Sequence, residues 1–142
     1  MNYFKEAENI LHKVKLLEKA LDNLKYHKGM IIQRNSPQGC KALSFDKTTS
    51  APINKETLTE MCEYAQCIER IAVTEEEIER IKNIISQLSN DEKNLIQMWY
   101  IDEMSKDEIK EKLYISSNST LYKLQRQAVS NFALLYFGAI IL

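Results

Sequence analysis

The stretch SKDEIKEKLYISSNSTLYKLQRQA, residues 105–128, decides the fold of this chain. It opens with Ser105, whose hydroxyl can accept a hydrogen bond from the third helical N–H, and Glu108 stands where it completes a capping box. Ile109 and Leu113 follow four residues apart, which places them on one helical face. We therefore expect a helix of about two turns to begin at Ser105.

The next four residues, Tyr114 to Ser117, interrupt that helix. Either Ser116 or Ser117 can cap a further helix, because serine oxygens accept hydrogen bonds from the first free N–H groups. Apolar residues follow at helical spacing, namely Leu121, Leu124 and Ala128. Two helices joined by so short a connection suggest a helix-turn-helix motif.

Another helix is expected immediately upstream. Ser89-Asn90-Asp91-Glu92 repeats the capping-box spacing, so a helix should begin there and run to about Tyr100. We predict that residues 89–142 form a helix-turn-helix domain and that residues 1–88 form a separate N-terminal part.

The N-terminal part carries two seams of apolar residues at the alternating spacing of three and four that is typical of paired helices. The first seam consists of Ala7, Ile10, Val14, Leu17, Leu21 and Leu24, and Gly29 offers a stop for its helix. The second, preceded by Met61 and joined by Ile68, consists of Tyr64, Cys67, Ile71, Thr74, Ile78, Ile81, Ile85 and Leu88. Residues 29–53 have the proline, glycine and serine content of a long loop. We therefore expect an antiparallel, coiled-coil-like helical hairpin over residues 1–88.

Charge and composition support helices throughout. Residues 1–28 hold six Lys against four Asp and Glu, net +2, whereas residues 54–88 hold four Lys and Arg against eight Glu, net −4. These opposite signs favour pairing of the two seams. The chain of 142 residues has only three glycines and two prolines, so the predicted fold class is all-α.

Signals of catalysis and metal binding are missing from the sequence. It contains no glycine-rich phosphate loop, no His-Glu-x-x-His helix and no nucleophile elbow. His12 and His27 are fifteen residues apart and Cys62 and Cys67 five apart, and neither spacing matches a usual zinc pattern. We expect no enzyme, no cofactor and no metal.

Cysteine usage and hydropathy bear on the compartment. The three cysteines are an odd number and no charged-then-apolar leader precedes them, which favours a cytoplasmic protein with free thiols. The most apolar stretch, residues 132–142, is eleven residues long, whereas a membrane-spanning helix needs roughly 20. No membrane association is expected.

A longer pattern covers residues 86–136. It comprises Leu95-Ile96-Gln97-Met98-Trp99-Tyr100, then Met104-Ser105, Glu108-Ile109, Leu113 and a final Ser-Thr-Leu-Tyr-Lys-Leu. This pattern resembles region four of bacterial sigma factors, which recognises the promoter −35 element. The whole chain, with its helical hairpin and its ending Phe132-Ala-Leu-Leu-Tyr-Phe-Gly, is similar to small phage and prophage transcription regulators of the ArpU and RinA type. The resemblance implies a DNA-binding transcription regulator, an activator of phage late genes. Tyr114 stands where region four commonly has glycine, and a positive φ there would cost about 1 kcal/mol.

Candidate DNA contacts lie at the start of the last helix. If Ser117 caps it, polar residues cluster opposite the apolar stripe, near the end that enters the major groove. Asn118 can pair with an adenine edge and Arg126 with guanine or phosphate, while Lys123 and the hydroxyls of Ser119 and Tyr122 suit backbone oxygens. The predicted DNA-binding residues are Ser117, Asn118, Ser119, Tyr122, Lys123 and Arg126.

Partners follow from the charge of this segment. Residues 114–142 contain Lys123 and Arg126 and no acidic residue. Two cations neutralise few phosphates, so we expect a monomer to bind double-stranded DNA weakly and to need a homodimer partner, RNA polymerase or a sigma factor. The alternative is a structural or adaptor protein, such as a packaging subunit, whose coiled coil serves oligomerisation.

Overall fold

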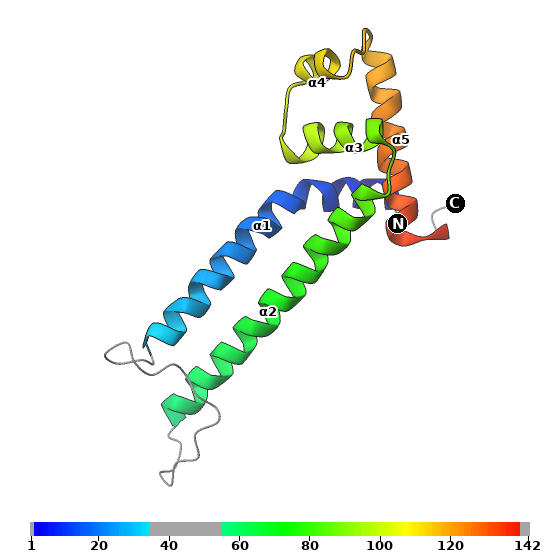
Figure 1. The fold of residues 1–142 in the computed structure, drawn as a ribbon. Helices are drawn as coiled ribbons and strands as arrows, with labels where there is room; N and C mark the ends of the chain where they lie inside the picture. Colours follow the sequence, from blue (N-terminus) through cyan, green and yellow to red (C-terminus); the bar gives the residue numbers. More distant parts are fainter. Residues whose placement is uncertain (1, 35–54, 140–142) are drawn as a thin grey trace. The chain divides into compact units, whose positions relative to one another are not determined.

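The computed structural model describes residues 2–34 and 55–139. These residues form helices and contain no strand, which confirms the all-α class. The elements are α1 (Tyr3–Arg34), α2 (Lys55–Ser86), α3 (Asn90–Ile96), the π-helical segment η2 (Gln97–Ile101), α4 (Lys106–Lys112) and α5 (Asn118–Phe137), shown in Figure 1.

The helix α1 does not stop at Gly29, so that prediction was wrong. It continues to Arg34, and a Cβ placed on Gly29 would meet nothing within 4 Å. A glycine within a helix costs roughly 0.5–1 kcal/mol. Two residues later Ile31 is fully buried, and burying such a side chain contributes about 1.5–3 kcal/mol. Continuing the helix is therefore favourable, and the rest of the predicted loop, residues 35–53, lies outside the described residues.

Contacts divide the chain into two compact units. One unit combines Met1–Leu17 with Glu77–Leu142, and the other is Glu18–Glu76. α1 and α2 each contribute residues to both units. The prediction had placed the boundary after residue 88, whereas here the first turns of α1 and the last turns of α2 are grouped with the C-terminal helices.

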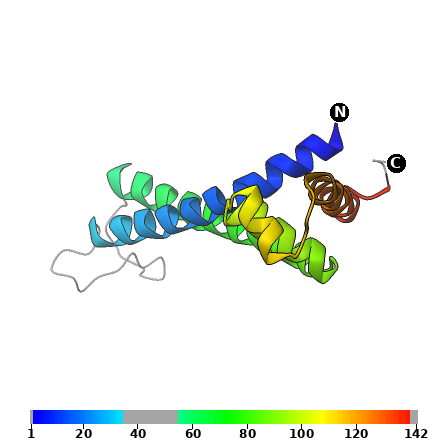
Figure 2. The same cartoon turned by 90° about the horizontal axis from the view of Figure 1, so that it is seen from above.

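Within residues 18–76, α1 and α2 run antiparallel (Figures 1 and 2). Lys25 Nζ lies 3.4 Å from Glu75 Oε1, and Arg34 Nη2 lies 3.4 Å from Glu60 Oε2. The cations come from α1 and the acids from α2, in agreement with the charge difference in the sequence. Each exposed pair contributes about 0–1 kcal/mol, so apolar burial is the larger stabilising effect.

Most residues of the predicted hairpin seams are buried or partly buried, but the fully buried Leu11 and Ile31 were not assigned to them. Cys67 and Ile71 are buried together with Ile31, and the Sγ of Cys67 donates to the Leu24 carbonyl at 3.3 Å. Ile68, which was expected to join this seam, is instead 38% exposed. A residue one position after Cys67 is rotated about 100° away from it on a helix, so both cannot face α1.

The other unit has its own core, built from the first turns of α1, the end of α2 and the C-terminal helices. Its largest fully buried side chains include Tyr100, Phe132, Leu95, Ile109 and Leu121. α3 packs against α5. This core positions α5, whose first half carries the predicted contacts.

Tyr136 links the C-terminal end of α5 to α2. The Tyr136 hydroxyl donates to Glu77 Oε1 at 2.5 Å, and Arg80 donates to the Tyr136 carbonyl at 3.2 Å. The Arg80 guanidinium also lies 4.0 Å from the centre of the Tyr136 ring. Burial and the hydrogen bond to Glu77 raise the pKa of the Tyr136 hydroxyl. The ring of Phe137, next in the chain, packs 5.1 Å from that of Tyr3.

Candidate nucleic-acid interface

A serine caps the N-terminus of each of the helices α3, α4 and α5, as predicted. Ser89 Oγ accepts a hydrogen bond from the Glu92 N–H, and Ser105 Oγ accepts one from the Glu108 N–H at 3.3 Å. Of the two serines considered for α5, Ser117 is the cap: its Oγ accepts from the Thr120 N–H at 3.2 Å. This assignment fixes the register of every candidate contact on α5.

The connection between α4 and α5 consists of residues 113–117. The Ile115 N–H donates to the Lys110 carbonyl at 2.8 Å and the Tyr114 N–H to the Glu111 carbonyl at 3.4 Å, which is the hydrogen-bond pattern of a Schellman motif. Tyr114 has φ +57°, the left-handed conformation expected for this position. Because this turn is short, α5 begins only a few residues after the end of α4.

From Asn118 to Ser130 the outward face of α5 is polar, and it holds three of the predicted contacts. Ser119, Lys123 and Arg126 are exposed, and they recur at the spacing of one helical face. Leu121, Ala128 and Val129 are fully buried on the opposite side. Asn118, in the first turn, is also exposed. The structure therefore brings four of the six predicted residues to the surface at the beginning of α5.

Two further residues of this face were missed by the sequence analysis. Gln127 and Ser130 are exposed and follow Lys123 by four and seven residues. The signal was present in the sequence, since positions 119, 123, 126, 127 and 130 lie on one side of a helix. An amide such as that of Gln127 can read an adenine edge, so this residue extends the candidate contact surface.

Ser117 and Tyr122, the other two predicted contacts, are occupied within the protein. Ser117 is partly buried, and its Oγ lies 2.7 Å from Thr120 Oγ1 besides capping α5. Tyr122 is partly buried, and its ring meets that of Trp99 at 5.8 Å and an interplanar angle of 75°. Lys106 Nζ lies 4.9 Å from the centre of the Tyr122 ring. These contacts join α4 and η2 to α5.

A buried polar pair fixes the rotation of α5 about its own axis. Gln125 Nε2 donates to the Tyr100 hydroxyl at 2.7 Å, and both residues lie in the core. Burial raises the pKa of Tyr100, more than the hydrogen bond from Gln125 lowers it, and Glu8 of α1 raises it further. Because an unpaired polar group in the core is unfavourable, α5 must keep Gln125 inward and the opposite face outward.

A second polar link holds the middle of α5. Glu92 is buried, and its two carboxylate oxygens accept hydrogen bonds from Ser89 Oγ at 3.0 Å and from Asn131 Nδ2 at 2.9 Å. The carboxylate therefore both completes the cap of α3 and ties α3 to α5. The candidate interface rests on a helix with fixed position and rotation.

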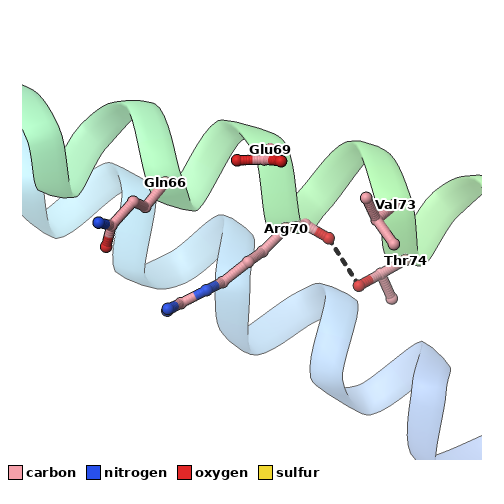
Figure 3. A pocket seen from close by; sticks show the side chains of 5 residues that line it. All are labelled: Gln66, Glu69, Arg70, Val73 and Thr74. Atoms are coloured by element: carbon pink, nitrogen blue, oxygen red, sulfur yellow. Dashed lines mark hydrogen bonds between the residues drawn. The ribbon is translucent and has the colours of Figure 1, made fainter.

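Other surfaces of the described residues offer less. A shallow hollow on α2 is lined by Gln66, Glu69, Arg70, Val73 and Thr74, all from this one helix (Figure 3). A ligand site normally has walls that converge on the ligand, and these residues supply a single wall. Thr74 Oγ1 donates to the Arg70 carbonyl at 2.7 Å, an ordinary bond within the helix.

The histidines and described cysteines lie in unrelated surroundings. The His12 ring packs edge-on to Tyr100, with centroids 4.8 Å apart, while His27 Nε2 lies 3.2 Å from Glu63 Oε1. Cys67 is buried and Cys62 exposed. In residues 2–34 and 55–139 no group of three His, Cys, Asp or Glu is arranged to hold a metal ion. Nor does any helix there have the length and apolar character needed to cross a membrane.

Comparisons with known proteins give a family without an assigned activity. Residues 44–133 match a family model described as a protein of unknown function, DUF1492. No curated protein and no solved structure matches the chain.

Proposed function

The chain belongs to the DUF1492 family, whose description assigns no function, and from the geometry of its C-terminal helices we propose that it is a DNA-binding transcription regulator. In this proposal α4 and α5 act as a helix-turn-helix motif, and α5 enters the major groove of double-stranded DNA. The single observation that carries the proposal is the outward face of α5. That face holds Ser119, Lys123, Arg126, Gln127 and Ser130, all exposed.

Charge supports the choice of nucleic acid as ligand. From Tyr114 to the end of α5 the chain has two cations and no acidic residue, although residues 89–142 carry six Lys and Arg against seven Asp and Glu. A polar, acid-free helix face is suited to a groove lined by phosphates. Arg126 and Lys123 supply charge, while Asn118 and Gln127 supply amides that can distinguish adenine.

The resemblance of residues 86–136 to region four of sigma factors supports the same function and makes it more specific. We propose an activator of phage or prophage late genes that binds upstream of a promoter and contacts RNA polymerase or its sigma factor. Two cations on α5 release few counterions on binding, so a second contact is physically required for tight binding. Purified bacterial RNA polymerase should therefore increase the affinity of this protein for its DNA site.

A homodimer is the other source of added affinity that we propose. Besides the seam toward α1, α2 has a second row at the spacing of three and four residues, formed by Leu58, Met61, Ala65, Ile68 and Ala72. Leu58 is 54% exposed and Ile68 is 38% exposed. An Ile68→Lys variant should keep its helix content and sediment as a monomer. If the wild-type chain sediments as a monomer at micromolar concentration, the dimer is excluded.

Selection from a random pool of DNA duplexes tests the function itself. The full-length protein is incubated with the pool at low salt, and the retained duplexes are sequenced. We expect an enriched motif that Arg126→Ala loses and that Lys19→Ala keeps, since Lys19 is an exposed cation of α1 and belongs to neither α4 nor α5. No enrichment, with or without RNA polymerase, would favour the structural or adaptor function.

A further inference from the structure

Tyr114 has a backbone conformation that favours glycine. Its φ is +57°, and it occupies the left-handed position that ends α4, where the Ile115 N–H bonds to the Lys110 carbonyl. For a residue with a Cβ this conformation is unfavourable, because the Cβ approaches a backbone carbonyl oxygen. Glycine would lift the penalty and change the ratio of folded to unfolded protein by about fivefold.

The Tyr114 side chain does not stabilise the fold. It is 96% exposed, the highest value among the exposed large hydrophobic side chains of the described residues, and Tyr26 follows at 72%. A tyrosine stabilises a protein by burying its ring or by bonding through its hydroxyl, and a side chain so exposed does neither. An unfavourable backbone conformation at a residue whose side chain does not stabilise the fold indicates that the side chain contacts a binding partner.

The surroundings of Tyr114 point to one kind of partner. It lies three residues before Ser117, the cap of α5, in the connection that leads to the exposed first turn holding Asn118 and Ser119. The chain carries no acidic residue from Tyr114 onward, and on the α4 side the exposed Lys112 precedes Tyr114 by two residues and the exposed Glu111 by three. Tyrosine hydroxyls are among the side-chain groups that donate hydrogen bonds to phosphate oxygens in protein–DNA complexes.

We propose that Tyr114 is a DNA-backbone contact whose hydroxyl donates a hydrogen bond to a phosphate oxygen next to the groove that α5 enters. This inference rests on the proposed function and adds a residue to it. A phosphate contact positions the protein without reading bases. Loss of Tyr114 therefore weakens binding to the selected site and to unrelated duplexes by a similar factor.

The test compares stability and DNA binding in three variants of the full chain. Tyr114→Gly should shift the unfolding equilibrium by about fivefold toward the folded state and weaken DNA binding about tenfold. Tyr114→Phe keeps the ring and the backbone conformation, and it should lose a similar factor in affinity because only the hydroxyl is removed. Glu103→Gly is the matched control: Glu103 is the other non-glycine residue with positive φ in the described chain, at +52°. It should gain stability without losing affinity.

The outcomes separate this inference from the proposed function. A wild-type chain that binds DNA while Tyr114→Gly binds equally well overturns the role of Tyr114 and leaves the proposed function intact. Weaker binding by Tyr114→Gly with full affinity in Tyr114→Phe overturns the hydroxyl–phosphate contact. A wild-type chain without DNA binding overturns both proposals.

Discussion

The side-chain amide of Gln125 on α5 donates a 2.7 Å hydrogen bond to the hydroxyl of Tyr100 on η2, and both groups are sealed in the core. Inside a protein such a bond is stronger than in water, and leaving either partner alone is costly. The pair therefore determines which side of α5 faces the solvent. The polar face with Lys123 and Arg126 is outward because Gln125 is held inward.

Breaking this pair should destabilise the protein. Tyr100→Phe leaves the Gln125 amide without its acceptor, and Gln125→Leu leaves the Tyr100 hydroxyl without its donor, so each variant should lose about 1–3 kcal/mol of unfolding free energy. The double variant should lose less than the sum, since no unpaired group remains between them. Urea denaturation of the four proteins measures this coupling, and strictly additive losses would contradict it.

Stability should fall at alkaline pH. Burial raises the pKa of Tyr100, and burial together with Glu77 raises that of Tyr136, whereas an unfolded tyrosine ionises near pH 10. Below about pH 10 both states hold these protons and stability is unaffected; above it the unfolded chain releases them first, so unfolding becomes more favourable as pH rises. Denaturation between pH 8 and 11 should show this decline. The Tyr100→Phe variant lacks the Tyr100 hydroxyl, so its stability should decline less steeply with pH. Equal slopes in the variant and the wild type would contradict a raised pKa of Tyr100.

Features encoded in neighbouring residues were predictable from the sequence. The capping serines and the spacing of the hairpin seam depend on residues within one or two turns, whereas the left-handed conformation of Tyr114 was left open and came from the structure. Gln125 was not predicted as a core residue, because a buried amide is recognisable only when its partner, Tyr100, is known to lie beside it. Tyr122 was placed among the DNA contacts for the same reason: its packing on Trp99 depends on how η2 approaches α5. Gly29 shows the limit of a local rule, since burial of Ile31 outweighs glycine's cost.

The cap of α5 provides a local test of its register. Ser117→Ala removes the acceptor of the Thr120 N–H and should cost about 1 kcal/mol of stability. Ser116→Ala is a matched control, because Ser116 is exposed and its neighbour provides the cap. Thermal unfolding of the two variants distinguishes them. A larger loss in Ser116→Ala would move the start of α5 by one residue and change every contact assigned to it.

The two described glycines should respond in opposite directions to alanine. Gly29 lies within α1 and a Cβ there would meet nothing within 4 Å, so Gly29→Ala should stabilise the protein by roughly 0.5–1 kcal/mol. Gly138 has φ +85° at the end of α5, so Gly138→Ala should destabilise it. Unfolding free energies of both variants check this. Loss of stability in Gly29→Ala would indicate that α1 ends before Gly29 in solution.

The most direct test of the central claim is a titration of the isotope-labelled full chain with a duplex that carries the selected motif, followed by its backbone amide NMR signals. If α5 reads DNA, the largest signal changes should fall between residues 114 and 130 and saturate with added duplex, and Arg126→Ala should weaken them. Changes confined to residues 18–76, or no change at a saturating concentration of duplex, would contradict the account.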